Sequence, residues 1–548
     1  MKPSHLPAAR RSSSPLSGRP LAVLLLVGGA LWTLGGPLHA QTTFTWSPGT
    51  SGALDTTTNW TPNGVPGSTA TTSDTALFAN SANNLTLTQA ASGVVGGGSG
   101  TLGVLISVDG TQTGSVAFTN TGTIRLAGVS VGAGAGAVTF SGTGGYNVGG
   151  ISAATTNTFT NNSSNLLTFS GNLLAGGSGV RTLDFQGAGN TAVSGVINSA
   201  AIALQKGGAG TLTLSNANVY TGLTSLNGGI TVVRNATALG TTAAGTVVAS
   251  GATLQLQNNI TVGAEALTLS GAGATGGAGA LENNGGTNTY GGAITLAANS
   301  TVAANNGTVL NLTSASAVGG SGFTLTLTGS GTGTITGGVA TGGGGLSKIN
   351  AGTWTLGGTS TYTGATTVSA GALLVSGSTG ASAVAVSNSG TILGGTGTVG
   401  GVVTVNNGAV LQGGAGAATG ALTLASAPVL NAGSVIGLTL GAGNTHSTLA
   451  LPSGFNGFQA NQTFTLGGVQ AGTYDNVITG VAGGIVTTGW TVNNGSGFTF
   501  SFSDDGTSID LVVAAVPEAS TWAAGALCVG LVVVGLRRRG VFSSAPGR

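Results

Sequence analysis

The residues that could do chemistry are few in this sequence, and most of them lie far apart. Ten of the eleven acidic residues are spread over its long middle part, and only Asp504, Asp505 and Asp510 cluster. These three carboxylates could bind Ca²⁺ through their oxygens. We favour a solvated turn, because Asp505 is followed by Gly between two apolar alternating runs, which is a strong hairpin signal. The sequence predicts a hairpin with strands near 498–502 and 509–513, and no metal site.

Nucleophilic and metal-based catalysis lack their usual residues. His446 is the only histidine after residue 39, so it cannot build a histidine-based metal site, and no Ser-His-Asp arrangement is recognisable around it. We expect it to lie in a loop. Cys528 is the single cysteine, which excludes an intrachain disulfide and a cysteine-based metal site. The sequence predicts no catalytic residue, no metal and no cofactor.

An alternative function is a polysaccharide lyase or hydrolase. Glycosidases need two positioned carboxyl groups. The acids that could supply them are scattered over the sequence: Asp55, Asp74, Asp109, Asp184, Glu265, Glu282, Asp475, Asp504, Asp505 and Asp510. The enzyme interpretation therefore requires folding to bring distant acids onto one face.

The composition restricts the class of protein. The 548 residues include 105 Gly and 12 Pro, and only 4% are charged, against about 25% in an average globular protein. Such a composition excludes a conventional cytosolic enzyme, a charged disordered chain and collagen. Glycine, Thr, Ser, Asn and Val together predict short strands joined by tight turns.

The basic residues concentrate at the two ends of the chain. Only Arg125, Arg181, Lys206, Arg234 and Lys348 lie between residues 41 and 515. The middle part is therefore net acidic, and it has no clustered basic stretch for nucleic acid. We expect no nucleic-acid partner.

Both ends of the chain carry patterns that resemble targeting signals. Residues 1–40 combine basic residues, an apolar run over 21–34 and a small residue at Ala40, which predicts a secretory signal peptide cleaved before Gln41. Near the other end, the apolar run over 521–536 would span about 24 Å as a helix, which is short for a stable bilayer anchor. The body is therefore expected outside the inner membrane.

The C-terminal pattern resembles a known sorting signal. Residues 516–540 begin with Val516, Pro517, Glu518 and Ala519, continue as the apolar run and end in Arg537, Arg538 and Arg539. This order resembles a PEP-CTERM sorting signal, with Ala519 where the family usually has Pro. The resemblance implies cleavage near the motif by an exosortase-type membrane enzyme. The alternative is an ordinary C-terminal anchor, in which the three arginines stop transfer through the membrane.

Two segments of the middle part repeat each other. Residues 204–233 and 346–375 align without gaps and share Lys, Ala-Gly-Thr, Thr-Leu and Tyr-Thr-Gly at equivalent positions. Polar and apolar residues alternate in 211–214 and 353–356, which is the pattern of a half-buried strand. Units of this kind bury a continuous core only when stacked, and parallel stacking gives a β-helix. The segments resemble the autotransporter-associated β-strand repeat, which implies a secreted right-handed parallel β-helix, or β-solenoid.

The aromatic N-terminal part has two interpretations. Trp46 and Trp60 lie in a stretch rich in Pro, and solenoids need closed ends. We expect residues 41–90 to cap the first coil. The alternative is a carbohydrate-stacking site built on the two indole rings.

We expect a solenoid over 91–440, followed by a C-terminal β region over 441–515. The favoured function is a non-enzymatic protein of the cell surface or extracellular matrix, exported across the inner membrane and membrane-anchored before processing. Its expected partners are the processing enzyme, exopolysaccharide or cell-surface glycans, and, transiently, the inner membrane. A filament built by end-to-end pairing of coils is a further alternative.

Overall fold

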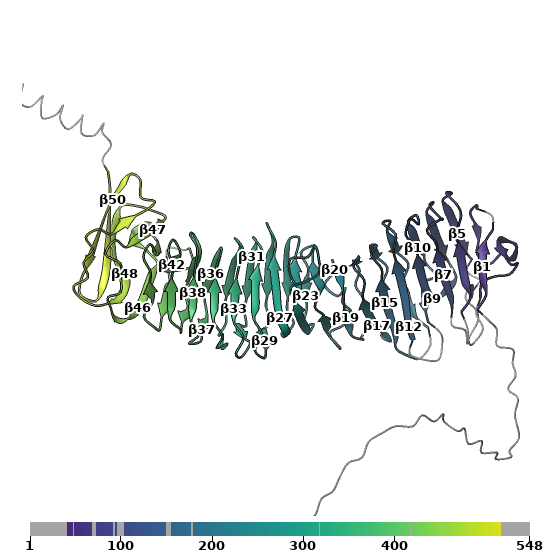
Figure 1. Cartoon of the computed structure of the whole chain (residues 1–548), viewed down its shortest axis with the longest axis horizontal. Helices are drawn as coiled ribbons and strands as arrows, with labels where there is room; N and C mark the ends of the chain where they lie inside the picture. Colours follow the sequence, from purple (N-terminus) through teal and green to yellow (C-terminus); the bar gives the residue numbers. More distant parts are fainter. Residues whose placement is uncertain are drawn as a thin grey trace, which may run out of the picture. The chain divides into compact units, whose positions relative to one another are not determined.

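The computed structural model describes residues 41–47, 49–67, 73–90, 94–95, 103–149, 155–176, 179–316, 318–416 and 419–516. In this part the chain is all-β, and its helical content consists of two short 3-10 segments, η1 (Thr57–Asn59) and η2 (Ala442–Asn444). Most strands pair in parallel with the equivalent strand of the next coil, as Figure 1 shows. The predicted all-β parallel β-solenoid is confirmed.

Three stacks of strands form the walls of the solenoid. The first stack runs along its whole length and is continued beyond β32 through backbone hydrogen bonds of Ser360 and Thr361. Its strands are β1 (Thr43–Trp46), β4 (Thr75–Phe78), β7 (Val104–Val108), the second half of β9 (Thr123–Val131), β12 (Thr155–Asn161), β15 (Arg181–Gln186), β17 (Ile202–Lys206), β19 (Thr224–Leu226), β21 (Thr246–Val248), β24 (Leu267–Gly271), the first half of β27 (Ile294–Ala304), β29 (Val318–Gly320), β32 (Val339–Ala340), β37 (Ser378–Thr379), β40 (Thr398–Val399), β43 (Ala421–Leu424), β46 (Thr448–Phe455) and β48 (Gly472–Val481).

The second stack follows the first in each coil. Its strands are β2 (Gly52–Ala53), β5 (Leu85–Gln89), β8 (Val116–Asn120), β10 (Val138–Gly142), β13 (Leu167–Phe169), β16 (Thr191–Val193), β18 (Thr211–Leu214), β20 (Gly229–Val233), β22 (Ala252–Leu256), β25 (Leu281–Asn283), the second half of β27, β30 (Leu325–Thr328), β33 (Leu346–Lys348), β35 (Thr366–Val368), β38 (Val384–Val386), β41 (Val403–Val405) and β44 (Val429–Leu430).

The third stack closes each coil. Its strands are β6 (Val94–Val95), the first half of β9, β11 (Tyr146–Val148), β14 (Leu173–Ala175), β23 (Thr261–Val262), β26 (Thr287–Tyr290), β28 (Val309–Leu312), β31 (Thr332–Ile335), β34 (Thr353–Leu356), β36 (Ala372–Val375), β39 (Ile392–Gly395), β42 (Val410–Gln412), β45 (Val435–Thr439), β47 (Thr463–Gly467) and β49 (Thr491–Val492). Parallel pairing thus starts at Thr43 and reaches Val492, beyond the expected solenoid bounds of 91 and 440.

The interior is a column of side chains from successive coils. Because the strands are in register, identical residues stack on one another, as in Phe118, Phe140 and Phe169. The ring centroids are 4.6 Å apart for the first pair and 4.8 Å for the second, with interplanar angles of 5° and 9°. Such offset stacking adds to the burial of apolar area. In this part of the solenoid, stacked apolar and aromatic side chains therefore hold successive coils together.

The two predicted repeats have the same pairing in the structure. In the first, Leu204 of β17 pairs with Thr224 of β19, and in the second Leu346 of β33 pairs with Thr366 of β35. However, β17 belongs to the first stack and β33 to the second. The repeat is therefore a local unit that has moved by one wall of the solenoid between its two copies.

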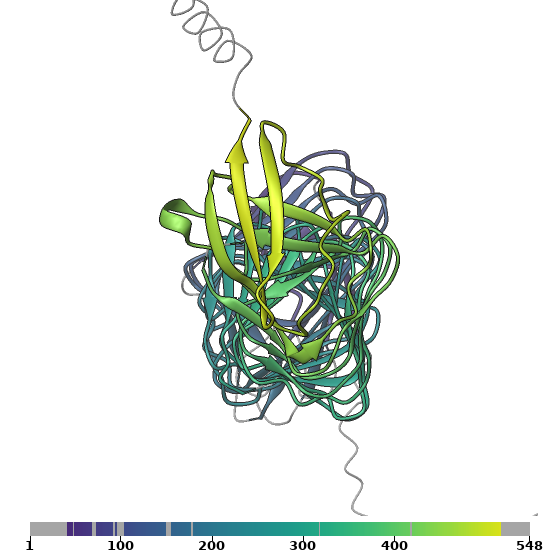
Figure 2. The same cartoon turned by 90° about the vertical axis from the view of Figure 1, so that its left-hand side faces the viewer.

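Antiparallel strands lie at the described ends. At one end β3 (Trp60–Thr61) pairs antiparallel with β1. At the other, β51 (Ser508–Ala515) pairs antiparallel with β48 and with β50 (Phe498–Asp504), which confirms the predicted hairpin. Figure 2, which is viewed from this second end, shows the hairpin in front of the coils. Phe502 of the hairpin stacks on Phe464 of β47 at 4.3 Å, so the hairpin packs on the last coils.

Candidate functional site

The lysines shared by the two repeats are the last residues of β17 and β33. Lys206 and Lys348 are 3% and 0% exposed. Lys348 Nζ donates hydrogen bonds to the carbonyl oxygens of Ile349 (3.0 Å), Asn350 (2.6 Å) and, in the following coil, Ala370 (2.9 Å). Lys206 Nζ contacts three carbonyl oxygens in the equivalent way. Burial lowers the pKa of each ammonium group to about 8. These lysines hold one coil to the next.

The tyrosines shared by the two repeats are also structural. Tyr220 and Tyr362 are fully buried, and their hydroxyl groups share hydrogen bonds with Thr224 Oγ1 (2.8 Å) and Thr366 Oγ1 (2.6 Å). Burial raises the pKa of both phenols above the ordinary value. The Tyr-Thr-Gly signature therefore ties a corner of the coil to the strand that follows it.

Most acidic side chains serve the local backbone. Asp55 and Asp475 are exposed. Each of the others accepts at least one hydrogen bond from a main-chain amide or a polar side chain in the described part: Asp74, Asp109, Asp184, Glu265, Glu282, Asp504, Asp505 and Asp510. No group of three or more His, Cys, Asp or Glu residues that could hold a metal ion occurs among the described residues.

The acidic cluster near the C-terminal hairpin has divided roles. Asp505 accepts hydrogen bonds from the main-chain amides of Thr507 (2.8 Å) and Ser508 (2.7 Å). These donors lower the pKa of its carboxyl group to about 2. Asp510 instead accepts a hydrogen bond from the amide of Asn476 at 2.7 Å. The carboxylates point to different backbone donors, as a turn requires.

The two indole rings of the N-terminal part pack against each other. Trp46 is 5% exposed, Trp60 is 0% exposed, and their ring centroids are 4.9 Å apart in an edge-to-face arrangement. Their Nε1 atoms donate to the carbonyl oxygens of Thr50 and Leu54. Both rings are buried and their N–H donors are satisfied, although the edge of Trp46 also lines a hollow of about 670 Å³. Their place fits a cap.

His446 lies close to η2, and its Nδ1 atom is 3.1 Å from the carbonyl oxygen of Ser447. The proposed signal peptide through Ala40 and the sorting segment after Val516, with Pro517, Glu518, Ala519, Arg537, Arg538 and Arg539, lie outside the described residues. Within the described residues, no helix has the length and apolar character needed to cross a membrane.

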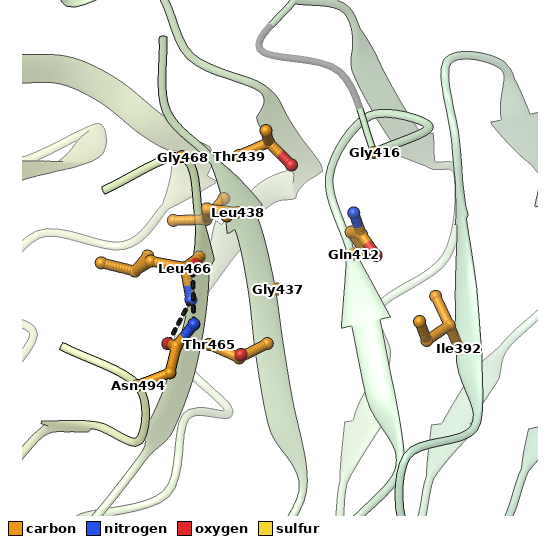
Figure 3. Close-up of a pocket in the computed structure, with 11 residues that line it drawn as sticks. Ile392, Gln412, Gly416, Gly437, Leu438, Thr439, Thr465, Leu466, Gly468 and Asn494 are labelled. Atoms are coloured by element: carbon orange, nitrogen blue, oxygen red, sulfur yellow. Dashed lines mark hydrogen bonds between the residues drawn. The ribbon is translucent and has the colours of Figure 1, made fainter. Parts of the chain in front are cut away.

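One hollow lies on the outward face of the third stack. Figure 3 shows its lining residues, most of which come from β39, β42, β45 and β47, with Gly416, Gly468 and Asn494 in connecting segments. It has a volume of about 400 Å³, and its middle is formed by Gln412, Gly437 and Thr465, which are register partners in successive coils. A β-carbon on Gly437 would lie 3.0 Å from Val410 Cγ1, so the absence of a side chain at Gly437 leaves space for the hollow.

At one edge of this hollow, the side chain of Asn494 makes the two main-chain hydrogen bonds that a neighbouring strand would otherwise make. Asn494 accepts a hydrogen bond from the amide of Leu466 through Oδ1 (2.9 Å) and donates to the carbonyl oxygen of Leu466 through Nδ2 (2.6 Å), as the dashed lines in Figure 3 show. Both hydrogen bonds close a backbone edge that the short β49 does not cover. Leu466 and Thr465 are thereby held in place.

A second hollow adjoins the first. It has a volume of about 330 Å³ and contains Val410, Val435 and Thr463, another set of register partners. Thr465 lines both hollows. We refer to the two hollows together as the trough. Its described lining residues are apolar, hydroxyl-bearing or amide-bearing, and none is charged, so the trough suits a neutral polar ligand.

Sequence reasoning did not identify the trough. Gln412, Thr439 and Thr465 have ordinary positions on alternating strands. They line one hollow only because β42, β45 and β47 are in register, and register between distant strands cannot be read from local alternation. The one local signal is Gly437 in the middle of a strand, which often marks a close approach of another group.

Comparison with known proteins supports the repeats. Residues 204–233 and 346–375 match the family profile described as the passenger-associated-transport repeat. These are the two segments predicted as repeats, so their positions and their relation to autotransporters are confirmed. The match covers these segments and not the whole chain. No curated protein matched the sequence in a separate search.

Proposed function

We propose that this chain is an exported, non-enzymatic β-solenoid that works at the cell surface or in the extracellular matrix, in the manner of an autotransporter passenger. The observation that carries the proposal is the coincidence of two passenger-associated-transport repeats with a parallel β-solenoid. The apolar core of the solenoid supports it, because burial of apolar side chains stabilises a rod that carries few charges.

Release of the chain is proposed to require processing near Pro517. The PEP-CTERM-like order of residues 516–540 supports an exosortase-type enzyme as partner and a transient stay in the inner membrane. A membrane anchor without cleavage is the competing outcome.

Export and processing can be tested together in the native host. An epitope tag is inserted between Thr242 and Ala243, which lie in an exposed loop. We expect tagged chain outside the cell, with an intact mass that ends near Pro517. A variant with Pro517→Ala and Glu518→Ala should remain in the membrane fraction, whereas the control Ser520→Ala should be released. Full-length chain retained in the inner membrane, with or without the substitutions, would refute processing.

The trough is the proposed contact site for a neutral stretch of exopolysaccharide or surface glycan. It crosses β39, β42, β45 and β47, and with strands about 4.8 Å apart its long direction follows the coils over roughly 14 Å. Hydroxyl groups of a sugar match the Thr hydroxyls and the Gln412 amide, and the apolar faces of its rings match Val410 and Val435.

A matched pair of variants tests this contact. Thr465→Trp fills both hollows, whereas Thr355→Trp adds the same ring to the same outward face in β34, away from the trough. Binding to exopolysaccharide purified from the host should be lost in the first variant and kept in the second. Equal binding by both variants would contradict a role of the trough.

A further inference from the structure

Arg234 is the one exposed side chain among the five basic residues between 41 and 515. The other four lysine and arginine side chains are buried or half-buried. Arg234 directly follows the first repeat, and the equivalent residue after the second repeat is Ser376. The repeat itself therefore does not explain why a net acidic part of the chain places a positive charge in solvent at this position.

Arg234 belongs to a column of polar residues at one corner of the solenoid. Each member directly follows a strand of the second stack, and the last residues of these strands are register partners. The column consists of Ser215, Arg234, Gln257, Asn284 and Asn305, which follow β18, β20, β22, β25 and β27. Main-chain hydrogen bonds continue the pairing through the column, as from Gln257 N to Val233 O (3.1 Å). Successive members are therefore about 4.8 Å apart.

A hollow opens along this column. It has a volume of about 390 Å³ and is lined by Ser215, Arg234, Gln257, Asn258, Asn284 and Gly285. Every lining residue belongs to the described part of the chain, and none is acidic. Because Arg234 is exposed and lines the hollow, a ligand in solution can reach its guanidinium group.

Neighbouring amide groups hold Arg234 in place. Its Nε atom donates to Gln257 Oε1 at 3.0 Å, and Gln257 Nε2 donates in turn to Oε1 of the buried Gln255 at 2.8 Å. Asn258 Nδ2 donates to the main-chain carbonyl oxygen of Arg234 at 3.2 Å. The Nη atoms of Arg234 make no hydrogen bond or ion pair with the described residues. Their N–H donors are therefore left for a ligand.

Neutral polar groups flank the guanidinium group along the column. Asn284 Oδ1 accepts a hydrogen bond from Asn305 Nδ2 at 3.1 Å, so the amide nitrogen of the exposed Asn284 remains for a ligand. Ser215 supplies a hydroxyl group at the other end of the hollow. From Ser215 to Asn284 the column spans three steps between coils, or roughly 14 Å. The hollow thus combines one positive charge with neutral hydrogen-bonding groups on both sides.

We propose that this hollow binds an acidic sugar unit, with its carboxylate on Arg234 and its hydroxyl groups on Ser215 and Asn284. The two Nη atoms of a planar guanidinium group suit the two oxygens of a carboxylate. A small inorganic oxyanion would fill only part of the volume of about 390 Å³, whereas a sugar ring also uses the amide and hydroxyl groups. The site shares no lining residue with the trough and rests neither on the trough nor on export.

Titration of the purified full chain tests the site. Trigalacturonate, its neutral counterpart galactotriose, sodium sulfate and sodium phosphate are added at constant ionic strength, so that general screening stays the same. Binding is followed by calorimetry. We expect trigalacturonate to bind the wild type more tightly than the other three. Arg234→Gln should weaken its binding about tenfold or more, as the loss of a hydrogen bond with a charged partner requires.

Two variants serve as controls. Val486→Glu lowers the net charge by the same amount as Arg234→Gln, at a side chain that is 72% exposed and does not line the hollow. Thr465→Trp fills the trough and leaves this hollow unchanged. Both variants should bind trigalacturonate as the wild type does. Arg234→Gln itself should fold normally, because the replaced side chain is exposed and makes one hydrogen bond.

The outcomes separate this site from general charge and from the trough. Weakened trigalacturonate binding in Arg234→Gln alone supports the site. Equal weakening in Val486→Glu or in Thr465→Trp overturns it, as does equal binding by Arg234→Gln and the wild type. No binding by the wild type, or binding of galactotriose, sulfate or phosphate as tight as that of trigalacturonate, also overturns it. Such a failure leaves export and the trough standing, because their tests use other variants and other ligands.

Discussion

Replacement of Lys348 by Met tests the structural role assigned to the repeat lysines. Methionine has a similar apolar stem and can fill the same space, but it donates no hydrogen bond. The carbonyl oxygens of Ile349, Asn350 and Ala370 would lose their charged donor. Hydrogen bonds to a charged group contribute about 1.5–3 kcal/mol each, so at the lower end of this range the three contacts together contribute about 5 kcal/mol.

The cost of burying the ammonium group offsets part of this gain. Its pKa falls from 10.5 to about 8, and at neutral pH this lowering corresponds to about 3 kcal/mol. We therefore expect Lys348→Met to lower the local free energy of unfolding by about 2 kcal/mol at pH 7. Hydrogen exchange of amides in this coil would accelerate about 30-fold.

The assay is hydrogen exchange read by mass spectrometry. The informative amides are those of Ile349 and Ser369, which donate to Leu327 and Lys348, the latter through its main-chain oxygen. Lys206→Met is the matched control, because stability in a solenoid is passed mainly between neighbouring coils. Each variant should accelerate exchange in its own repeat and leave the other unchanged. Exchange at 346–375 that stays within about threefold of the wild type in Lys348→Met would refute the reasoning, since the predicted 2 kcal/mol is about 30-fold.

Three further results follow from the structure. The folded-state pKa of about 8 at Lys206 and Lys348 lies below the unfolded value of 10.5, so between these pH values the unfolded chain binds more protons than the folded chain. The free energy of unfolding should therefore rise as the pH is raised from 8 to 10. Denaturant titrations should show this rise in the wild type and not in the variant with both lysines replaced by Met. Phe140→Ala removes the middle ring between Phe118 and Phe169 and should cost about 3–5 kcal/mol, measured by chemical denaturation, whereas an effect under about 1 kcal/mol would contradict tight stacking. The carboxyl pKa of about 2 at Asp505 lies below the unfolded value of 3.8. The ionised carboxylate should therefore stabilise the β50–β51 turn above about pH 4, and this stabilisation should disappear as the pH falls toward 2. Hydrogen-exchange protection of the Thr507 and Ser508 amides should follow the same pH dependence and should be low at every pH in Asp505→Ala.

The fold could be predicted because its signals are local and repeated. Alternation in 211–214 and 353–356, the lysines and the Tyr-Thr-Gly corners recur at equivalent places, and stacked strands need little other information. The hairpin at Asp505 was readable for the same reason. The bounds of the solenoid were not, because its first and last coils lack the repeat signature while they still pair in parallel.

The candidate sites depend on contacts that the sequence does not display. Lys348 was visible as a repeated residue, but one of its three acceptors, the carbonyl oxygen of Ala370, comes from the following coil. The trough requires Gln412, Gly437 and Thr465 to be in register across coils of different length. In each case the missing information is the length of the intervening coils.

The repeat lies on different walls of the solenoid in its two copies, which indicates that its residues stabilise the coils and do not form a fixed binding face. The same lysine and tyrosine contacts form whether the unit starts on the first stack, as at β17, or on the second, as at β33. The repeat therefore needs only the coil after it and carries no fixed outward face. A ligand, by contrast, contacts a particular face at a particular height. Specific binding is then expected where the signature ends and outward residues are free to vary, and the trough over β39–β47 lies in that part, just beyond the second repeat.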